Sequence, residues 1–382
     1  MLTRRERVLR TMQGEPVDRL AVSPRFWKFC QAYYGEYTLD TMLRSVDEFD
    51  WDMHYSAGGA TRSFYRPSIP APEELPEGVT ATGSVTEDEN VRHVHREFIT
   101  PAGTLTDAWH CPKPGRGYGI SPAPTATETL LKGPEDLEAL RFLRGHLVPA
   151  YIDNFVAIRE RAGEQGFIYP YVRCPFNDLS YVFPVADCLM LPYDDPRFLR
   201  DLLALLQEMC LEDIRAHLQA GTDSIFISGF HISLSVGWSP RFFREFFLPL
   251  IREQADLTHE GGALYHYYDD GKCMDILPML VEVGTDVFET CTPWPAGDFD
   301  PARARAIVGD TMTLMGYVDI ENVLHRGTPE LVERTVREAA ETMGRNGRFV
   351  IGSSDGILAQ TPAENVRTLF DAGRRYGAEV VA

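Results

Sequence analysis

The sequence lacks three features that would assign its class at once: a long apolar run, a paired set of cysteines and an excess of positive charge. No apolar run reaches the roughly 18 residues that a membrane helix needs. The charged segment 1–7 is not followed by the apolar stretch of a signal peptide. The seven cysteines are odd in number and scattered, which indicates a reducing cytoplasm rather than a disulfide framework. The net charge of -19 argues against nucleic acid or an anionic membrane as a partner.

Several catalytic signatures are also missing. No GxGxxG segment follows a strand-like run, so a nucleotide-binding doubly wound fold has no support. A Ser–His nucleophile pair is not predicted from this sequence. Neither CxxC nor HExxH occurs, so a zinc site would have to be assembled from distant residues.

What the sequence does contain is a regular alternation of strand-like and helix-like segments. Its 382 residues, 44% hydrophobic, are enough for one large core. From about residue 150, apolar runs alternate with amphipathic stretches, which predicts parallel strands joined by right-handed crossovers. With a first strand near Val22, the count approaches eight units. We therefore predict one α/β domain over residues 1–382, a (β/α)8 TIM barrel. The expected strands are 167–172, 224–228, 262–268, 286–291, 313–318 and 348–352.

Four features add to this picture. Thr3–Glu6 is a capping box that opens an N-terminal helix ending at Gly14, an extension ahead of the barrel. Pro249 is expected to break a helix, and the closing helix is expected to end at Gly377. Residues 58–119 are rich in Pro and Gly and contain alternating segments at 91–98 and 103–106, typical of an antiparallel hairpin. We interpret this region as an inserted candidate lid.

The stretch 262–271 has the pattern of an active-site strand. Its first half is apolar and its second half carries polar and acidic groups. Alternate residues of a strand share a face, so His266, Tyr268 and Asp270 are expected to point the same way. In a parallel barrel, ligands gather at the carboxyl ends of the strands.

Polar residues end several of the predicted strands. A lone aspartate there more often caps the next helix, and Cys291 alone is more often a small buried apolar residue. His266 alone could equally be a core histidine with its hydrogen bonds satisfied. Six successive strands ending in acid, His or Cys exceed what capping requires. The set comprises Asn177, Asp178, Ser228, His231, His266, Tyr268, Asp269, Asp270, Glu289, Cys291, Asp319, Ser353, Ser354 and Asp355.

Two chemistries fit this set. Zinc binds His, Cys and carboxylate ligands, so His266, Asp270 and Cys291, with Asp355 opposite, form a candidate metal site. Without a metal, Asp270 and Asp355 are a candidate general acid and base.

A further set of short segments is distributed over nearly the whole length of the sequence: Arg4–Leu9, Gly14–Arg19, Pro101–Leu105, Pro134–Leu137, Gly316–Asp319, Gly327–Glu330, Ser354–Ile357, Thr361–Asn365 and Arg374–Gly377. In these segments the sequence resembles the uroporphyrinogen decarboxylase superfamily. The resemblance implies a (β/α)8 barrel, and a family that includes haem-pathway decarboxylases and zinc-dependent methyltransferases acting with a corrinoid protein.

Single positions separate the two branches. The arginines of the decarboxylases' RQAGR segment are absent from Cys30–Tyr34, and the histidine of their GHG segment is replaced at Ser354–Gly356. A site that neutralises several carboxylates would not lose two guanidinium groups. In the methyltransferase branch, the zinc ligands of HxCG and a distant Cys correspond here to Tyr268, Asp270 and Asp355. This is similar to family members with an HSDG-like segment, several of which resemble O-demethylase components.

The resemblance thus implies a methyltransferase that demethylates a small methoxylated or methylamine compound. The acceptor would be cob(I)alamin on a separate corrinoid protein, with zinc as candidate cofactor and a second copy of the chain as a candidate dimer partner. A small-acid decarboxylase without metal or corrinoid is the main alternative, and a non-catalytic binding barrel is another. The assigned residues are His231, Asp270 and Asp355 for catalysis, Trp27, Tyr268 and Asp319 for substrate, and His266, Asp270 and Cys291 for zinc.

Overall fold

The computed structural model describes residues 1–57, 67–117, 122–143 and 149–382, and the chain divides into two compact units. The first unit comprises Met1–Gly58, Asp153–Val172 and Ile214–Ala382, and the second comprises Gly59–Ile152 and Arg173–Asp213. Each unit is described by itself below. The single domain over residues 1–382 stays a prediction.

The strands of the first unit form two parallel sheets that Val22 connects. Strands β7 to β12 pair in chain order, and β1 pairs with β6. Val22 bridges to Ile351 of β12, and its carbonyl accepts from the Asp52 amide just before β1 (3.0 Å). Pro170, which has no amide hydrogen, separates β6 from β7. The bounds are β1 (Met53–Ser56), β6 (Gly166–Tyr169), β7 (Tyr171–Val172), β8 (Ser224–Ser228), β9 (Leu264–Tyr268), β10 (Val287–Thr290), β11 (Thr313–Val318) and β12 (Phe349–Ser353).

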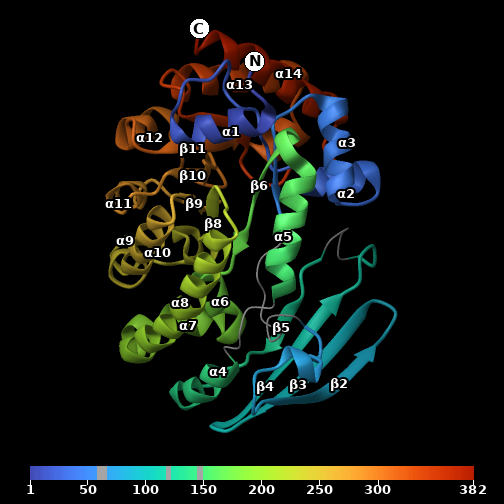
Figure 1. Ribbon diagram of the computed structural model, residues 1–382, viewed down its shortest axis with the longest axis vertical. Helices are drawn as coiled ribbons and strands as arrows, with labels where there is room; N and C mark the ends of the chain where they lie inside the picture. The colour runs from blue at the N-terminus through green and yellow to red at the C-terminus, as the bar shows by residue number, and fades with distance from the viewer. Residues whose placement is uncertain (58–66, 118–121, 144–148) are drawn as a thin grey trace. The chain divides into compact units, whose positions relative to one another are not determined.

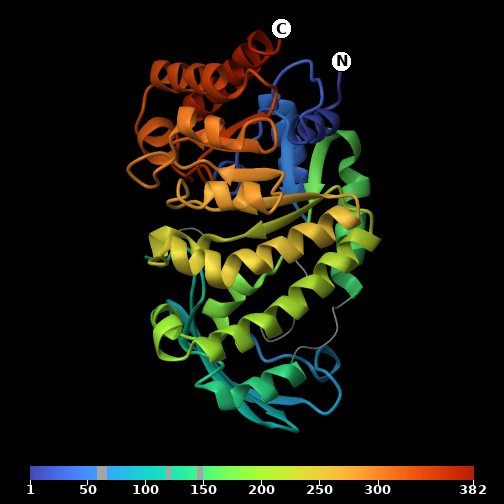
Figure 2. The ribbon, with the colours of Figure 1, turned by 90° about the vertical axis from the view of Figure 1, so that its left-hand side faces the viewer.

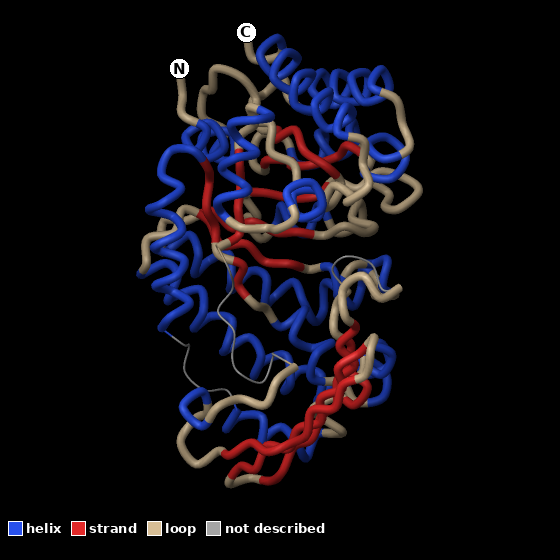
Figure 3. The backbone as a smooth tube through the Cα atoms, turned by 90° about the vertical axis from the view of Figure 1, so that its right-hand side faces the viewer, coloured by secondary structure: helices blue, strands red, loops and turns tan. Residues whose placement is uncertain are grey.

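Helices follow these strands and surround them. Figure 1 shows β8 to β11 stacked in chain order, and Figure 3 shows the strands of this unit enclosed by helices. Helices α13 and α14 lie side by side (Figure 2). With Val22 and β6–β7 each counted as one position, the strands take eight parallel positions, which confirms the predicted (β/α)8 barrel. The helices are α5 (Pro149–Ala162), α9 (Pro240–Phe242), α10 (Leu248–Glu260), α11 (Leu277–Glu282), α12 (Pro301–Val308), α13 (Pro329–Met343) and α14 (Ala363–Glu379).

Inward-facing side chains fill the barrel. The core cluster takes alternate residues from the strands, such as Phe167 and Tyr169 of β6. Val8 and Met12 of α1 (Arg4–Gln13) belong to the same cluster, so the N-terminal helix contributes to the barrel core. The predicted capping box at Thr3 and the helix end at Gly14, with φ of 70°, are both present. Helices α2 (Trp27–Tyr34) and α3 (Leu39–Phe49) complete the extension.

Two helix boundaries are informative. A π-helical turn, Phe243–Phe247, precedes α10, and Pro249 lies in the first turn of that helix, so the expected break is present. The expected end of α14 at Gly377 is wrong, because the helix continues to Glu379. Gly377 instead packs against the chain at Leu20, where an added Cβ would lie 3.2 Å from the Leu20 Cβ. In the described ranges, no helix is long and apolar enough to cross a bilayer.

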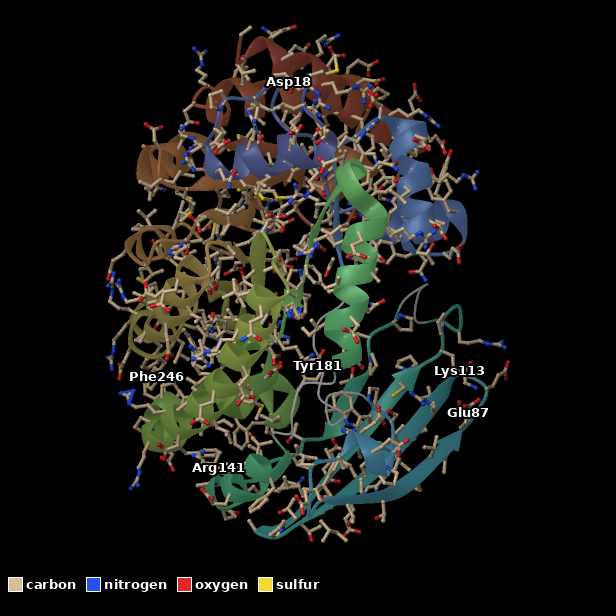
Figure 4. The ribbon with its side chains drawn as sticks, viewed as in Figure 1. Asp18, Glu87, Lys113, Arg141, Tyr181 and Phe246 are labelled. Atoms are coloured by element: carbon tan, nitrogen blue, oxygen red, sulfur yellow. The ribbon has the colours of Figure 1, made fainter. Side chains whose placement is uncertain are left out.

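The second unit contains an antiparallel sheet in the order β2-β3-β4-β5. Its strands β3 and β4 pair from Val91↔Pro112 to Thr100↔Gly103, which confirms the predicted hairpin. An ion pair joins Lys113 and Glu87 at 2.7 Å (Figure 4). Residues 58–66, 118 and 119 of the predicted insertion lie outside the described residues, and its role as a lid stays a prediction. The strands are β2 (Thr80–Glu87), β3 (Val91–Thr100), β4 (Gly103–Pro112) and β5 (Thr125–Glu128), and the helices are α4 (Leu137–Leu143), α6 (Pro175–Val182), α7 (Val185–Asp194) and most of α8 (Pro196–Gln219).

Candidate functional site

Strand β9 places His266 and Tyr268 inside the barrel. His266 is fully buried, and its ring centroid lies 5.0 Å from that of Phe226 and 6.0 Å from that of Tyr169. Tyr268, two residues further along, also contacts Phe226, with centroids 5.7 Å apart. His266 and Tyr268 therefore share one strand face, as the alternation indicated.

At the carboxyl end of β9, one phenol bridges two carboxyl groups. The Tyr268 hydroxyl lies 3.1 Å from Asp270 Oδ2 and 3.2 Å from Asp355 Oδ1. On the other side of Asp355, Lys28 Nζ lies 3.1 Å from Oδ2. The barrel thus brings together Asp270 and Asp355, which are distant in the sequence, and adds Lys28 to them.

The protonation of this group is displaced from its usual range. Burial, and then the charge of Asp355, raise the pKa of Asp270. The same two causes raise the pKa of the Tyr268 phenol well above its usual range, so the phenol keeps its proton. The Asp270 carboxyl therefore holds a proton more strongly than an exposed aspartic acid does.

A buried ion pair supports Tyr268 from within the barrel. Arg25 donates from Nε to Glu289 Oε1 (2.8 Å) and from Nη2 to Oε2 (2.9 Å), a bidentate arrangement. Its guanidinium lies 4.2 Å from the Tyr268 ring centroid and 4.9 Å from that of Phe226. Although burial alone would raise it, Arg25 and then His266 hold the pKa of Glu289 well below its usual range.

Two histidines flank Glu289. His266 Nε2 lies 3.0 Å from Glu289 Oε2, and His54 Nε2 lies 3.9 Å from Oε1. Ser23 donates its hydroxyl proton to the Asp52 carbonyl, so its oxygen accepts from His54 Nδ1 at 2.8 Å. Burial lowers the pKa of His54 to about 4, which makes its imidazole neutral at pH 7.

The predicted zinc ligands do not assemble. Cys291 follows β10 with a φ of 56°, and its buried thiol faces the Phe288 carbonyl at 3.8 Å. Burial raises the pKa of that thiol, whereas zinc requires the thiolate. His266 faces Glu289, both of whose oxygens are bonded to Arg25. Among the residues that the structure describes, no three His, Cys, Asp or Glu side chains are placed to hold a metal ion. The residues therefore do not fit the zinc site proposed from sequence.

The remaining predicted residues occupy different surroundings. Trp27 lies beside the Asp355 segment, since a Cβ on Gly356 would come within 2.7 Å of its indole nitrogen. His231 lies in the turn after β8, and its carbonyl accepts from Trp238 Nε1 (3.0 Å).

Asp319 and Asp269 each bond to backbone near their own strand end. Asp319 Oδ1 accepts from the amides of Glu321 and Asn322, both at 2.8 Å, so Asp319 caps the following π-helical turn. Asp269 is fully buried and accepts from the Gly271 amide (2.8 Å), and burial raises its pKa to about 8.

Sequence reasoning missed Arg25 and Lys28. Both follow the Val22 segment that connects the two sheets, where a predicted first strand could have drawn attention to them. Their partners lie more than 260 residues away, with separations of 264 for Arg25–Glu289 and 327 for Lys28–Asp355. No local sequence motif could indicate pairs of residues so far apart.

Comparison with known proteins assigns the family. The uroporphyrinogen decarboxylase (URO-D) family profile matches residues 117–376, more than half of the chain. A methylated-thiol–coenzyme M methyltransferase of Methanosarcina mazei is 24% identical over 227 residues, 59% of this chain and 58% of that protein. A uroporphyrinogen decarboxylase of Crocosphaera subtropica is 22% identical over 228 residues, 57% of this chain and 61% of the relative. The matches thus span about three fifths of these curated relatives.

A solved structure supports the fold over the full length. A methyltransferase from Methanosarcina mazei superposes with a TM-score of 0.69 at 17% identity, covering 98% of this chain and 99% of that one. This likeness confirms the barrel architecture. The family match confirms the resemblance found in the sequence: the chain belongs to the uroporphyrinogen decarboxylase family.

Proposed function

We propose that this protein is a methyltransferase that takes a methyl group from a small methoxylated or methylamine compound. Its acceptor is cob(I)alamin carried by a separate corrinoid protein. The similarity to a methylated-thiol–coenzyme M methyltransferase supports methyl transfer. The observation that carries the proposal is the Tyr268-bridged pair of Asp270 and Asp355 at the carboxyl end of β9.

A methyl group attached to oxygen leaves poorly unless the oxygen is activated by a Lewis acid or a proton. The predicted zinc ligands do not assemble, whereas Asp270 is a carboxyl group with a raised pKa. A proton from Asp270 is therefore the activation that this site supports.

The ion pair of Arg25 argues against a porphyrinogen substrate. The Nε and Nη2 atoms of Arg25 are both bonded to Glu289, so this guanidinium is not free to neutralise a substrate carboxylate. The arginines that decarboxylases use in the RQAGR segment are absent here, as described above.

The test is methyl transfer to free cob(I)alamin. Purified protein is mixed with methoxylated aromatics, methylamines or betaines, and formation of methylcob(III)alamin is followed by absorbance. We expect turnover of at least one donor and a loss of about 10²-fold or more in Asp270→Asn, the scale of general acid catalysis. Asp275→Asn, an exposed carboxyl after the same strand, is the matched control and should retain the rate. Carbon dioxide release from small acids without methyl transfer would identify a decarboxylase instead.

A further inference from the structure

The Tyr268 hydroxyl has one proton but contacts two carboxyl groups. A phenol has a single O–H, yet the Tyr268 oxygen lies within hydrogen-bond distance of two carboxyl groups, at 3.1 and 3.2 Å. Each contact is a full hydrogen bond when one carboxyl group carries its own proton and donates it to the phenol oxygen. Two carboxylates sharing one phenol would also repel each other, so the geometry favours one neutral aspartic acid in the pair.

The surrounding charges decide which one. Lys28 places its ammonium 3.1 Å from Asp355 and so favours negative charge there. Arg25 is matched by Glu289. Arg25 and Lys28 are thus both paired with other carboxylates. Among the described residues, Asp270 forms no ion pair. The proton is therefore best placed on Asp270.

We propose that Asp270 is the neutral, proton-donating partner of the bridge, and that the methyl donor is a neutral methoxy ether rather than a methylammonium compound. This inference rests on the proposed methyl transfer. With Asp270 neutral, the charges of Arg25, Glu289, Lys28 and Asp355 cancel. No net negative charge then remains to balance a quaternary ammonium. A quaternary nitrogen also has no lone pair to accept a proton, whereas an ether oxygen does have a lone pair.

The step balances with the acceptor already named. The methyl carbon–oxygen bond breaks, its electron pair stays on oxygen, and that oxygen takes the Asp270 proton to become an alcohol or phenol. Cob(I)alamin supplies the electron pair of the new cobalt–carbon bond, which gives methylcob(III)alamin. The Asp270 carboxylate then regains a proton from solvent.

Lys28 acts through Asp355 and is a positioning residue. Without its charge, the negative form of Asp355 loses its partner and the shared proton moves toward Asp355. We expect Lys28→Met to slow transfer from a methoxy donor, but by less than the roughly 10²-fold that loss of the general acid itself costs. Lys28→Arg, which keeps the charge, should restore most of the rate. A purely structural role of Lys28 would lower thermal stability without changing the preference between donors.

The experiment compares two matched donors, neutral anisole and cationic N,N,N-trimethylanilinium, with free cob(I)alamin. We expect the methoxy donor to react at least ten times faster, and Asp270→Asn to slow that donor selectively. Faster transfer from the ammonium donor, or an equal loss for both donors in Asp270→Asn, would overturn the ether assignment. No transfer from any methylated donor would overturn the proposed function and the ether assignment together.

Infrared spectroscopy of the carboxylic acid carbonyl tests the proton separately from activity. The difference spectrum of wild type minus Asp270→Asn at pH 7 should contain a protonated-carboxyl band. Asp269→Asn controls for Asp269, the other acid with a raised pKa on this segment. A difference spectrum without that band would overturn the protonation of Asp270, whatever the activity.

Discussion

Removal of Arg25 should destabilise the barrel far more than removal of an arginine from a surface ion pair. Glu289 is 1% exposed and Arg25 15% exposed, so Arg25→Met leaves a buried carboxylate without its cation. Breaking a buried pair in this way costs about 3–5 kcal/mol. The matched control is Arg244→Met, whose pair with Glu282 is about half exposed at 2.9 Å and is expected to contribute about 0–1 kcal/mol.

The assay is urea unfolding at several pH values. In wild type the pKa of Glu289 is lowered, so its stabilisation is present above the unfolded-state value of 4.5 and is lost as pH falls. In Arg25→Met burial dominates and raises that pKa, so the variant gains stability as Glu289 takes up a proton. The difference in free energy of unfolding between wild type and Arg25→Met should therefore decrease from pH 7 toward pH 4.5. Arg25→Met/Glu289→Gln should recover much of the loss. A cost equal to that of Arg244→Met, or a difference independent of pH, would refute the argument.

Three further predictions concern single residues. Burial lowers the pKa of His217 to about 4, so its stabilisation is present above pH 6.5 and is lost toward pH 4. Wild type should lose up to about 3 kcal/mol of stability over this pH range, and thermal melts of His217→Phe should not show that loss. A variant with the same pH dependence as wild type would contradict this prediction. Asp319→Ala should cost about 0.5–2 kcal/mol in urea unfolding, because it removes a cap, with kcat unchanged; a large fall in kcat would indicate a substrate role. Cys291→Ala should keep the methyl-transfer rate, and its zinc content should equal that of wild type by metal analysis; a joint loss of zinc and activity would restore Cys291 as a ligand.

The barrel was predictable because its signals are local. Each strand such as Ser224–Ser228 is a short apolar run followed by an amphipathic helix, and that alternation determines the parallel order. The meeting of Asp270 with Asp355 followed from the same rule, since the carboxyl ends of barrel strands converge.

The chemistry around those aspartates depends on distances that no local pattern encodes. Arg25 and Glu289 form their pair across 264 residues. The direction of Cys291 depends on a positive φ, a backbone conformation that the strand pattern gave no reason to expect, so the sequence could not indicate that its thiol faces the Phe288 carbonyl. Asp319 caps the following π-helical turn, as strand-end aspartates more often do, and its substrate role stays a prediction.

The most direct test of the central claim is the initial rate of methylcob(III)alamin formation from a methoxylated aromatic donor in three proteins. Wild type and Asp275→Asn should form product at the same rate, and Asp270→Asn should be slower by about 10²-fold or more, with all three equally folded by circular dichroism. Equal rates in Asp270→Asn and wild type would contradict the assignment of Asp270 as the acid.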